Sequence, residues 1–177
     1  IAIVPDSEVY AGDYLICTAS AMDVDGDSTT LSYEWFNNGS DSLGTGNSIT
    51  LDGPVYQDVV SCVVTATDAN GGSGSASVEV QLENTPPTVD GADLPEEAYA
   101  DSTVDCTPVD EYDIDGQELT FSYGWMVNGA VIPNTENSLS GEFVGGDEVE
   151  CSIIPNDGVE DGEAISDSIT IENTVPE

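Results

Sequence analysis

The feature that most constrains this chain is an internal repeat with a period of about 89 residues. Three sets of residues return at that spacing, and the matching pairs are Asp25–Gly39 with Asp115–Gly129, Cys17 and Cys62 with Cys106 and Cys151, and the boundary motifs Glu83–Pro87 with Glu172–Pro176. We therefore expect two domains of one kind, covering residues 1–85 and 86–177. The recurrence of the boundary motif predicts that they belong to a longer array.

Within each repeat the short apolar runs alternate with a period of two, which is typical of half-buried β-strands. Leu31, Tyr33 and Trp35 share one face of such a strand, and the second copy repeats the pattern. Each Trp strand leads into Asn-Gly, at Asn38-Gly39 and Asn128-Gly129, the strongest short signal of a β-hairpin. Proline is expected at the boundaries, outside the central strand ladders. The sequence therefore predicts an all-β fold.

Two cysteines flank the tryptophan of each repeat, and all three residues occupy inward-facing positions of their predicted strands. This arrangement resembles the immunoglobulin superfamily. The Asp-x-Asp-Gly segment before a Tyr-x-Trp strand, together with the Asn-Thr-x-Pro boundaries, looks more like bacterial immunoglobulin-like or PKD-like surface repeats. Val60 and Val149 stand two residues before the second cysteines, where antibody-type domains have the Tyr of the tyrosine corner.

The resemblance implies two tandem immunoglobulin-like Greek-key β-sandwiches, each with one intradomain disulfide against which its Trp packs. The implied pairs are Cys17 with Cys62 and Cys106 with Cys151. Free buried thiols are the alternative. Because disulfides form in oxidising compartments, we expect an extracellular or cell-surface protein, and the resemblance implies a bacterial one. The chain has no apolar stretch of about 18 residues, so we expect no direct insertion into a membrane.

The chain has 36 Asp and Glu residues and no Lys, Arg or His. Nucleic acid is excluded as a partner, because no side chain can replace the counterions of phosphate. Nucleophilic catalysis and phosphoryl transfer lack the base or the cationic clamp that they need, so we expect no enzyme activity. This much negative charge opposes a compact state unless salt or bound cations compensate for it. A merely solubilising role of the charge is the alternative.

An acidic loop precedes each Trp strand and carries Asp at alternating positions in a tight, Gly-containing turn, which directs several carboxylates at one point, as Ca²⁺ requires. In an immunoglobulin-like sandwich the loop after the second Cys strand shares that end, and boundary residues are expected to complete the second site. The expected Ca²⁺ ligands are Asp23, Asp25, Asp27 and Asp68 in the first repeat and Asp113, Asp115 and Asp157 in the second, with Glu83 and Asn84 from the boundary and Glu160 and Asp161 close by. Ordinary acidic turns are the alternative.

These features together predict a structural or adhesive repeat module of an extracellular stalk, fibre or filament, stiffened by calcium. Its partners would be neighbouring repeats of the same chain and copies of itself in a fibre. One alternative is an adhesin module that binds a ligand or a glycan, and another is a spacer of a secreted enzyme. A glycan-binding surface needs exposed aromatic side chains, and with both Trp residues assigned to the core the candidates are Tyr10, Tyr56 and Tyr112.

Overall fold

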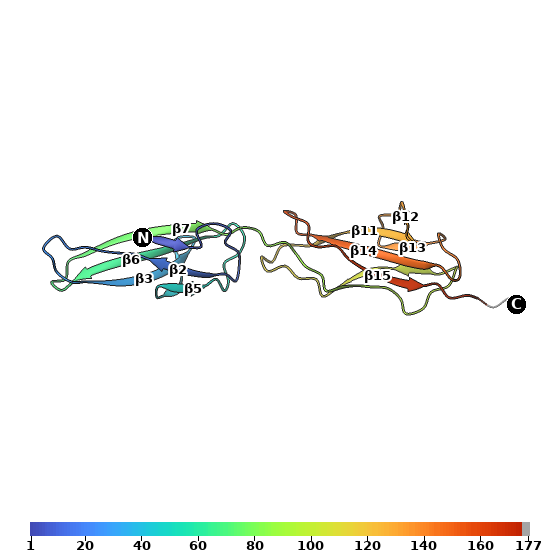
Figure 1. The fold of residues 1–177 in the computed structure, drawn as a ribbon, viewed down its shortest axis with the longest axis horizontal. Coiled ribbons are helices and arrows are strands. Elements are labelled where there is room, and N and C mark those ends of the chain that lie inside the picture. Colours follow the sequence, from blue (N-terminus) through green and yellow to red (C-terminus); the bar gives the residue numbers. More distant parts are fainter. Residues whose placement is uncertain (175–177) are drawn as a thin grey trace. The chain divides into compact units, whose positions relative to one another are not determined.

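The computed structural model describes residues 1–174, so Val175 and Pro176 of the second boundary motif lie outside the described residues. The regular structure of residues 1–174 is all β-strand, which confirms the predicted fold class. The chain divides into two compact units, Ile1–Thr85 and Pro86–Glu177, and Figure 1 shows the strands of both. Residues 1–174 contain no helix that is long and apolar enough to cross a membrane.

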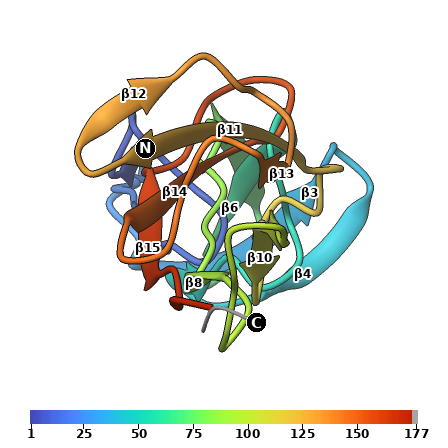
Figure 2. The same cartoon turned by 90° about the vertical axis from the view of Figure 1, so that its right-hand side faces the viewer.

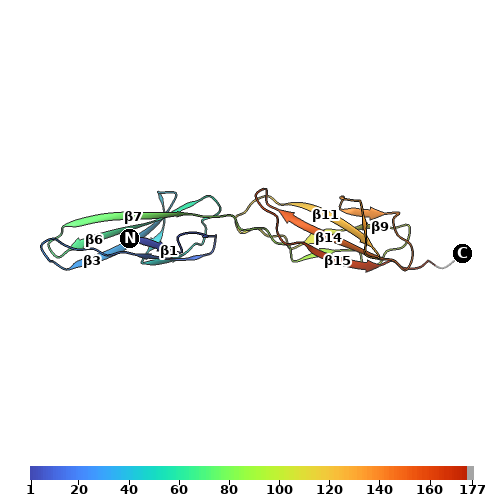
Figure 3. The same ribbon diagram turned by 45° about the horizontal axis from the view of Figure 1, so that its top comes forward.

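The first unit is a sandwich of two antiparallel sheets. Its strands are β1 (Ala2–Val4), β2 (Tyr14–Thr18), β3 (Thr29–Asn37), β4 (Asp41–Thr45), β5 (Ser48–Thr50), β6 (Val59–Asp68) and β7 (Ser73–Gln81). One sheet has the order β1-β2-β5 and the other the order β4-β3-β6-β7. The long strands β3, β6 and β7 lie side by side in Figure 3. Because β5 returns to pair with β2 after β3 and β4 have crossed to the other sheet, the connection is of the Greek-key type.

The second unit repeats this architecture with a divided smaller sheet. Its strands are β8 (Gly91–Asp93), β9 (Thr103–Asp105), β10 (Thr107–Val109), β11 (Thr120–Val127), β12 (Ala130–Ile132), β13 (Ser138–Ser140), β14 (Glu148–Asn156) and β15 (Ile165–Thr170). The larger sheet has the order β12-β11-β14-β15, and the smaller one consists of the pairs β8 with β10 and β9 with β13. The interruption between β9 and β10 lies at Cys106. Figure 2, in which this unit faces the viewer, shows β11 and β14 on one side and β8 and β10 on the other.

Both Trp strands turn at Asn-Gly, as predicted. Asn38 and Gly39 have φ angles of 48° and 74°, and Asn128 and Gly129 have φ angles of 49° and 75°. A type I′ turn requires positive φ at both central positions, and Asn and Gly adopt it at the lowest steric cost. Val127 and Ala130, which flank the second turn, pair directly with each other. The two residues of the turn are therefore the whole connection between β11 and β12.

One disulfide joins the two sheets of each unit. Cys17 is bonded to Cys62 and Cys106 to Cys151, which confirms the implied pairing, and both bridges span a sequence separation of 45 residues. A cross-link over that separation removes chain entropy from the unfolded state and stabilises the fold by about 4 kcal/mol. Neither unit therefore depends on its small apolar core alone.

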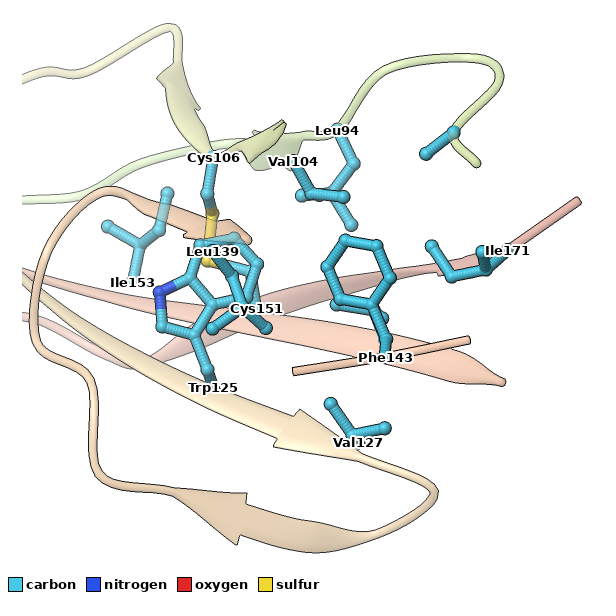
Figure 4. Close-up of a cluster of buried hydrophobic side chains, with 12 residues drawn as sticks. Leu94, Val104, Cys106, Trp125, Val127, Leu139, Phe143, Cys151, Ile153 and Ile171 are labelled. Atoms are coloured by element: carbon cyan, nitrogen blue, oxygen red, sulfur yellow. A yellow bond between two sulfur atoms is a disulfide. The ribbon is translucent and has the colours of Figure 1, made fainter. Parts of the chain in front are cut away.

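A buried tryptophan packs against each bridge. Trp35 is 0% exposed and Trp125 is 1% exposed. Each indole N–H donates to a backbone carbonyl, that of Gly46 at 2.9 Å in the first unit and that of Glu136 at 2.8 Å in the second. Figure 4 shows Trp125 beside the disulfide, with Phe143 farther along the core. The indole thus fills the centre of the sandwich without leaving its polar atom unpaired.

Proline is not confined to the boundaries, and that part of the sequence prediction is wrong. Pro155 lies in the central strand β14, directly opposite Phe121 of β11. The strand accommodates it because it is the next-to-last residue, and its carbonyl still accepts a hydrogen bond from the N–H of Gly162 at 2.8 Å. The first unit has Ala66 at this position, opposite Leu31.

Candidate functional site in the acidic loops

In the first unit, Asp23 holds the loop between β2 and β3. Its Oδ1 accepts the N–H groups of Asp25 at 2.9 Å and Asp27 at 3.2 Å. The N–H of Gly26 donates to the carbonyl of Asp23 at 3.3 Å, and Gly26 has a φ of 85°. An Asp side chain that accepts N–H groups from the residues that follow it in the sequence forms a tight turn. One oxygen of Asp23 is therefore engaged by the turn, whereas the side chains of Asp25 and Asp27 are exposed.

Asp68 holds the loop between β6 and β7 in the same way. Its Oδ1 accepts the N–H groups of Asn70 at 2.7 Å and Gly72 at 2.9 Å. The side-chain amide of Asn70 donates to Oδ2 of Asp27 at 2.7 Å, so the two acidic loops of the first unit are joined. No local pattern predicts the role of Asn70, because this role depends on a contact across 43 residues.

The loop between β10 and β11 of the second unit has the same turn but more buried oxygens. Asp113 accepts the N–H of Gln117 through Oδ1 at 3.3 Å. The other carboxylate oxygen of Asp113 and the Oε1 of Gln117 are buried and have no hydrogen-bond partner within residues 1–174. Asp115, between them in sequence, is only 8% exposed. Gln117 stands where the first repeat has Asp27, so this loop replaces a carboxylate with an amide oxygen.

The loop between β14 and β15 contributes a second buried carboxylate. Asp157 is 6% exposed, and its Oδ1 accepts the N–H groups of Val159 and Glu160, both at 2.7 Å. Asp161 is held by the side-chain amide of Asn156 at 2.7 Å. Oδ1 of Asp157 is thus engaged by its own turn, and Oδ1 of Asp161 is engaged by Asn156.

The two buried carboxylates of the second unit need a source of stabilisation. Asp115 and Asp157 are the buried charged residues of the described chain. Burying an ionised carboxylate costs several kcal/mol unless it is paired or hydrogen-bonded. No Lys, Arg or His exists in the sequence, so no side-chain cation can pair with either of them. Hydrogen bonds, such as those that Asp157 accepts from Val159 and Glu160, or a bound metal cation can stabilise them instead.

The oxygen donors of the second unit are compatible with Ca²⁺ as part of a mixed ligand set. In residues 1–174, no three Asp, Glu or Cys side chains gather closely enough to hold a metal ion by themselves. A cation would need amide, carbonyl or water oxygens as well, which suits Ca²⁺ because it takes 6–8 oxygen ligands. Oδ2 of Asp113 and Oε1 of Gln117, which have no hydrogen-bond partner within residues 1–174, are a carboxylate and an amide oxygen of the kinds that Ca²⁺ binds. In the first unit, Asn70 already donates to Asp27.

The predicted boundary ligands lie after β7, at the end of the first unit. Oε1 of Glu83 accepts the N–H of Glu8 at 3.3 Å, and the N–H of Glu83 donates to the carbonyl of Val9 at 2.7 Å. Asn84 follows and is half-buried. Their contribution to a calcium site stays a prediction.

A second polar arrangement, at the other end of each unit, was also missed by the sequence analysis. The side-chain amide of Asn38 donates to Oδ1 of Asp58 at 2.8 Å, while its own Oδ1 accepts the N–H of Val59 at 3.0 Å. The second unit repeats both bonds, at 2.8 Å and 3.1 Å, with Asn128 and Asp147 in the same places. Each hairpin is thereby tied to the turn that precedes the central strand.

These ties affect the acidity of both carboxyl groups. Burial acts to raise the pKa of Asp58, but hydrogen bonds from Asn38, from Asn37 and from the N–H of Val55 together outweigh burial and hold the pKa below its usual value. The pKa of Asp147 is lowered mainly by the hydrogen bond from its paired Asn and also by the N–H of Val144. The ionised carboxylates are therefore part of the folded structure.

Comparison with solved structures finds tandem immunoglobulin-like and fibronectin type III domains. A two-domain fibronectin type III segment of chicken tenascin is 13% identical, with a TM-score of 0.48 over 93% of this chain and 94% of that one. Three domains of the outer capsid protein Hoc of bacteriophage RB49 are 18% identical, with a TM-score of 0.40 over 98% of this chain and 69% of that one. The four N-terminal immunoglobulin domains of Dscam1 isoform 7.44 are 14% identical, with a TM-score of 0.41 over 94% and 42%.

No protein-family model and no curated protein matches the chain. Because the TM-scores are low, the assignment of an immunoglobulin-like tandem rests on the strand order and the disulfides of this chain itself. The bacterial, PKD-like character implied by the sequence motifs stays a prediction.

Proposed function

We propose that this chain is a pair of structural or adhesive repeats from an extracellular stalk, fibre or filament, and that calcium bound in its acidic loops stiffens it. The observation that carries the proposal is the duplicated core, in which the same disulfide and the same buried Trp are built twice on matching strands. Immunoglobulin-like tandems are typical of structural or adhesive modules. The residues that recur between the repeats serve the core, the hairpins and the loops, which supports a non-enzymatic role.

The disulfides support a location outside the reducing cytosol, at the cell surface or beyond it. The proposed partners are neighbouring repeats of the same chain and copies of the chain in a fibre. Nucleic acid is not among them, because the sequence has no cationic side chain.

The proposed calcium site of the second unit uses Asp113, Asp115 and Gln117, with Asp157 from the neighbouring loop. Two observations support it: Asp115 and Asp157 are buried, and the buried Oδ2 of Asp113 and Oε1 of Gln117 lack hydrogen-bond partners within residues 1–174. Extracellular calcium modules bind with dissociation constants of about 10⁻⁴ to 10⁻³ M, so at about 1 mM calcium the site would add roughly 0.4 to 1.4 kcal/mol. Bound calcium would then rigidify the loops more than it stabilises the fold.

The test of the calcium site is a titration of the whole chain with CaCl2 by calorimetry, against NaCl of equal ionic strength. Replacing Asp113 and Asp115 with Asn should abolish calcium binding at the second unit, which is expected to be the stronger of two binding steps. Gln117→Leu should weaken the same step. The same change at Asp23 and Asp25 should have a smaller effect. The control is Asp93→Asn with Asp105→Asn. It removes the same amount of charge from two exposed carboxylates of the same unit. Equal losses in all three double variants would show that calcium only screens charge.

The structural or adhesive role itself is tested by glycan-array binding and small-angle scattering of the whole chain. The tyrosines available for a glycan platform differ in exposure: Tyr112 is 61% exposed, whereas Tyr10 and Tyr56 are half-buried. A stalk should bind no glycan. In calcium, its dimensions measured by scattering should increase or become less variable. Saturable binding to one glycan that Tyr112→Ala removes would favour the adhesin alternative.

A further inference from the structure

The strand β7 forms one edge of the larger sheet of the first unit. Among the described residues it pairs only with β6, through a ladder without a bulge, and Figure 3 shows it on the outer side of β6. Residues 69–77 are all exposed, so the first half of the strand is open on both faces. Ile1, which lines a hollow together with Ser73–Ala76, leaves those residues exposed. This half of β7 therefore has a free edge.

The backbone groups that face the free edge belong to the odd-numbered residues of β7. In an antiparallel ladder, opposite residues alternate between pairs that exchange hydrogen bonds and pairs that do not. The N–H of Asp68 donates to the carbonyl of Gly72 at one end of the ladder, and the N–H of Leu82 donates to the carbonyl of Asp58 at the other, both at 2.9 Å. Counted inward from either bond, the even-numbered residues of β7 bond to β6. The residues whose N–H and C=O groups point away from β6 include Ser73, Ser75 and Ser77.

The other edge strands of the two larger sheets each carry a feature that hinders the addition of a strand. β4 contains Asp41, and its pairing with β3 has a register shift, while β12 is only three residues long. β15 places Asp167 opposite the buried Cys151, on the inward side of the strand. Bulges, short length and inward-pointing charges all protect sheet edges from further pairing. β7 has none of these features between Ser73 and Val78.

Charge decides which strand can occupy this edge. The chain has 36 acidic residues and no cationic side chain, so most of its segments would bring carboxylates toward one another. Residues 69–78 are uncharged, and the same segment of a second copy therefore meets the edge without opposing charge. A cationic partner would instead be drawn to the carboxylate-rich loops. The occupant that suits the edge is thus β7 itself.

Antiparallel pairing centred on Ser75 suits two copies of this strand. Ser75 then exchanges hydrogen bonds with its own counterpart, and Ser73 faces Ser77, so that the outward groups of both edges are paired. Glu79 lies across from Gly71 of the second copy. The two Glu79 residues are then about 27 Å apart, well beyond the screening length of about 8 Å at physiological ionic strength. Parallel pairing in register would bring them to about 5 Å.

We propose that β7 of the first unit is a strand-pairing site for β7 of a second copy of this chain. The two larger sheets then form one continuous sheet across a two-fold axis. The proposal rests on the fibre function proposed above, and it names the contact between copies. Because a two-fold contact is closed, it joins chains two by two.

The first test measures the mass of the whole chain in solution by sedimentation, over a range of concentrations. The mass should rise toward twice that of one chain, and more so at about 0.5 M NaCl than at about 0.05 M, because salt screens the repulsion between copies. Ser75→Pro should abolish this rise. It removes only an N–H that faces the free edge, so the ladder with β6 is kept.

The control is Ser166→Pro, because the N–H of Ser166 also faces the free edge of its strand, β15. This variant should associate as the native chain does. A single-chain mass of the native chain at every concentration and salt would overturn the proposal, and so would equal association of the native chain and Ser75→Pro.

Cysteine trapping tests the register in variants that keep the strand intact. Opposite Cα atoms of a hydrogen-bonded pair are about 5.5 Å apart, within the range of a disulfide, so oxidised Ser75→Cys should form a linked dimer. Ser77→Cys should not link to itself, because its counterpart lies about 14 Å away. It should link to Ser73→Cys when the two variants are mixed. Self-linking of Ser77→Cys, or no linking of Ser75→Cys, would overturn the proposed pairing.

These outcomes are distinguishable from those that test the proposed function. Calcium binding and glycan binding are properties of a single chain, so loss of the β7 contact leaves both unchanged. A chain that bound a glycan and failed as a stalk would still form the Ser75→Cys dimer.

Discussion

At the scale of single residues, the two Asn–Asp ties show how a chain without cations uses its carboxylates. Asp58 and Asp147 accept side-chain amides at 2.8 Å and hold the hairpins to the turns before β6 and β14. Amide donors here bind the ionised carboxylates, as Lys or Arg would do elsewhere. Unlike Lys or Arg, they add no charge. Both pKa values are lowered in consequence.

Acid should therefore weaken these ties. A carboxyl group whose folded pKa lies below its unfolded value stabilises the fold above the unfolded pKa of about 3.9, and that contribution is lost as the pH falls through the folded pKa. Asp58→Asn with Asp147→Asn should lower the melting temperature at pH 7 but leave it close to that of the native chain at pH 2. Asp101→Asn, in an exposed turn, is the control for charge removal. A gap between the double variant and the native chain that does not narrow in acid would contradict this role.

At the scale of strands and loops, the two units differ in the space beside one glycine, which is Gly74 opposite Ala66 in the first unit and Gly162 opposite Pro155 in the second. Gly162 meets the backbone of Pro87, whereas the space beside Gly74 is open. Ala in a strand is normally favoured over Gly by about 0.5–1 kcal/mol, so Gly74→Ala should be neutral or slightly stabilising. Gly162→Ala should instead destabilise the second unit by about 1–3 kcal/mol, because backbone must move to admit the methyl group. Chemical denaturation of both variants measures the contrast, and equal effects would mean that Pro87 yields without cost.

The strands and hairpins could be predicted because their signals are local. The alternation of apolar residues and the Asn-Gly turns predicted β3 and β11. The disulfide pairs were implied by a resemblance that the Trp residue of each repeat made specific. The contacts of Asn70 with Asp27, and of Asp58 with Asn38, could not be predicted, because each depends on which loops the sandwich brings together. Pro155 was misplaced for a related reason: whether a strand accepts proline depends on where its ladder ends.

At the scale of the whole molecule, charge sets the dependence on solvent. With a formal net charge of −36, each unit is opposed by its own self-repulsion. Raising NaCl from about 0.01 M to about 1 M shortens the screening length from about 30 Å to about 3 Å, so both units should melt at higher temperature. Each kcal/mol gained would raise the melting temperature of a domain of this size by about 4–8 °C. Calorimetric scans across that range, with chelator present, should show a steady rise, and a flat response would mean that local hydrogen bonding already compensates for the charge.

The position of the disulfides has a consequence for a chain that is pulled from its two ends. Each bridge joins β6 to β2 or β14 to the segment between β9 and β10, and encloses a separation of 45 residues. Tension passes through the sulfur atoms, so the enclosed residues carry no load even after the sheets have separated. Because an extended residue spans about 3.3–3.6 Å, each bridge withholds roughly 150 Å of contour length. When pulled, the oxidised chain should therefore extend only to a limited length. A reductant would release the contour length that each bridge withholds.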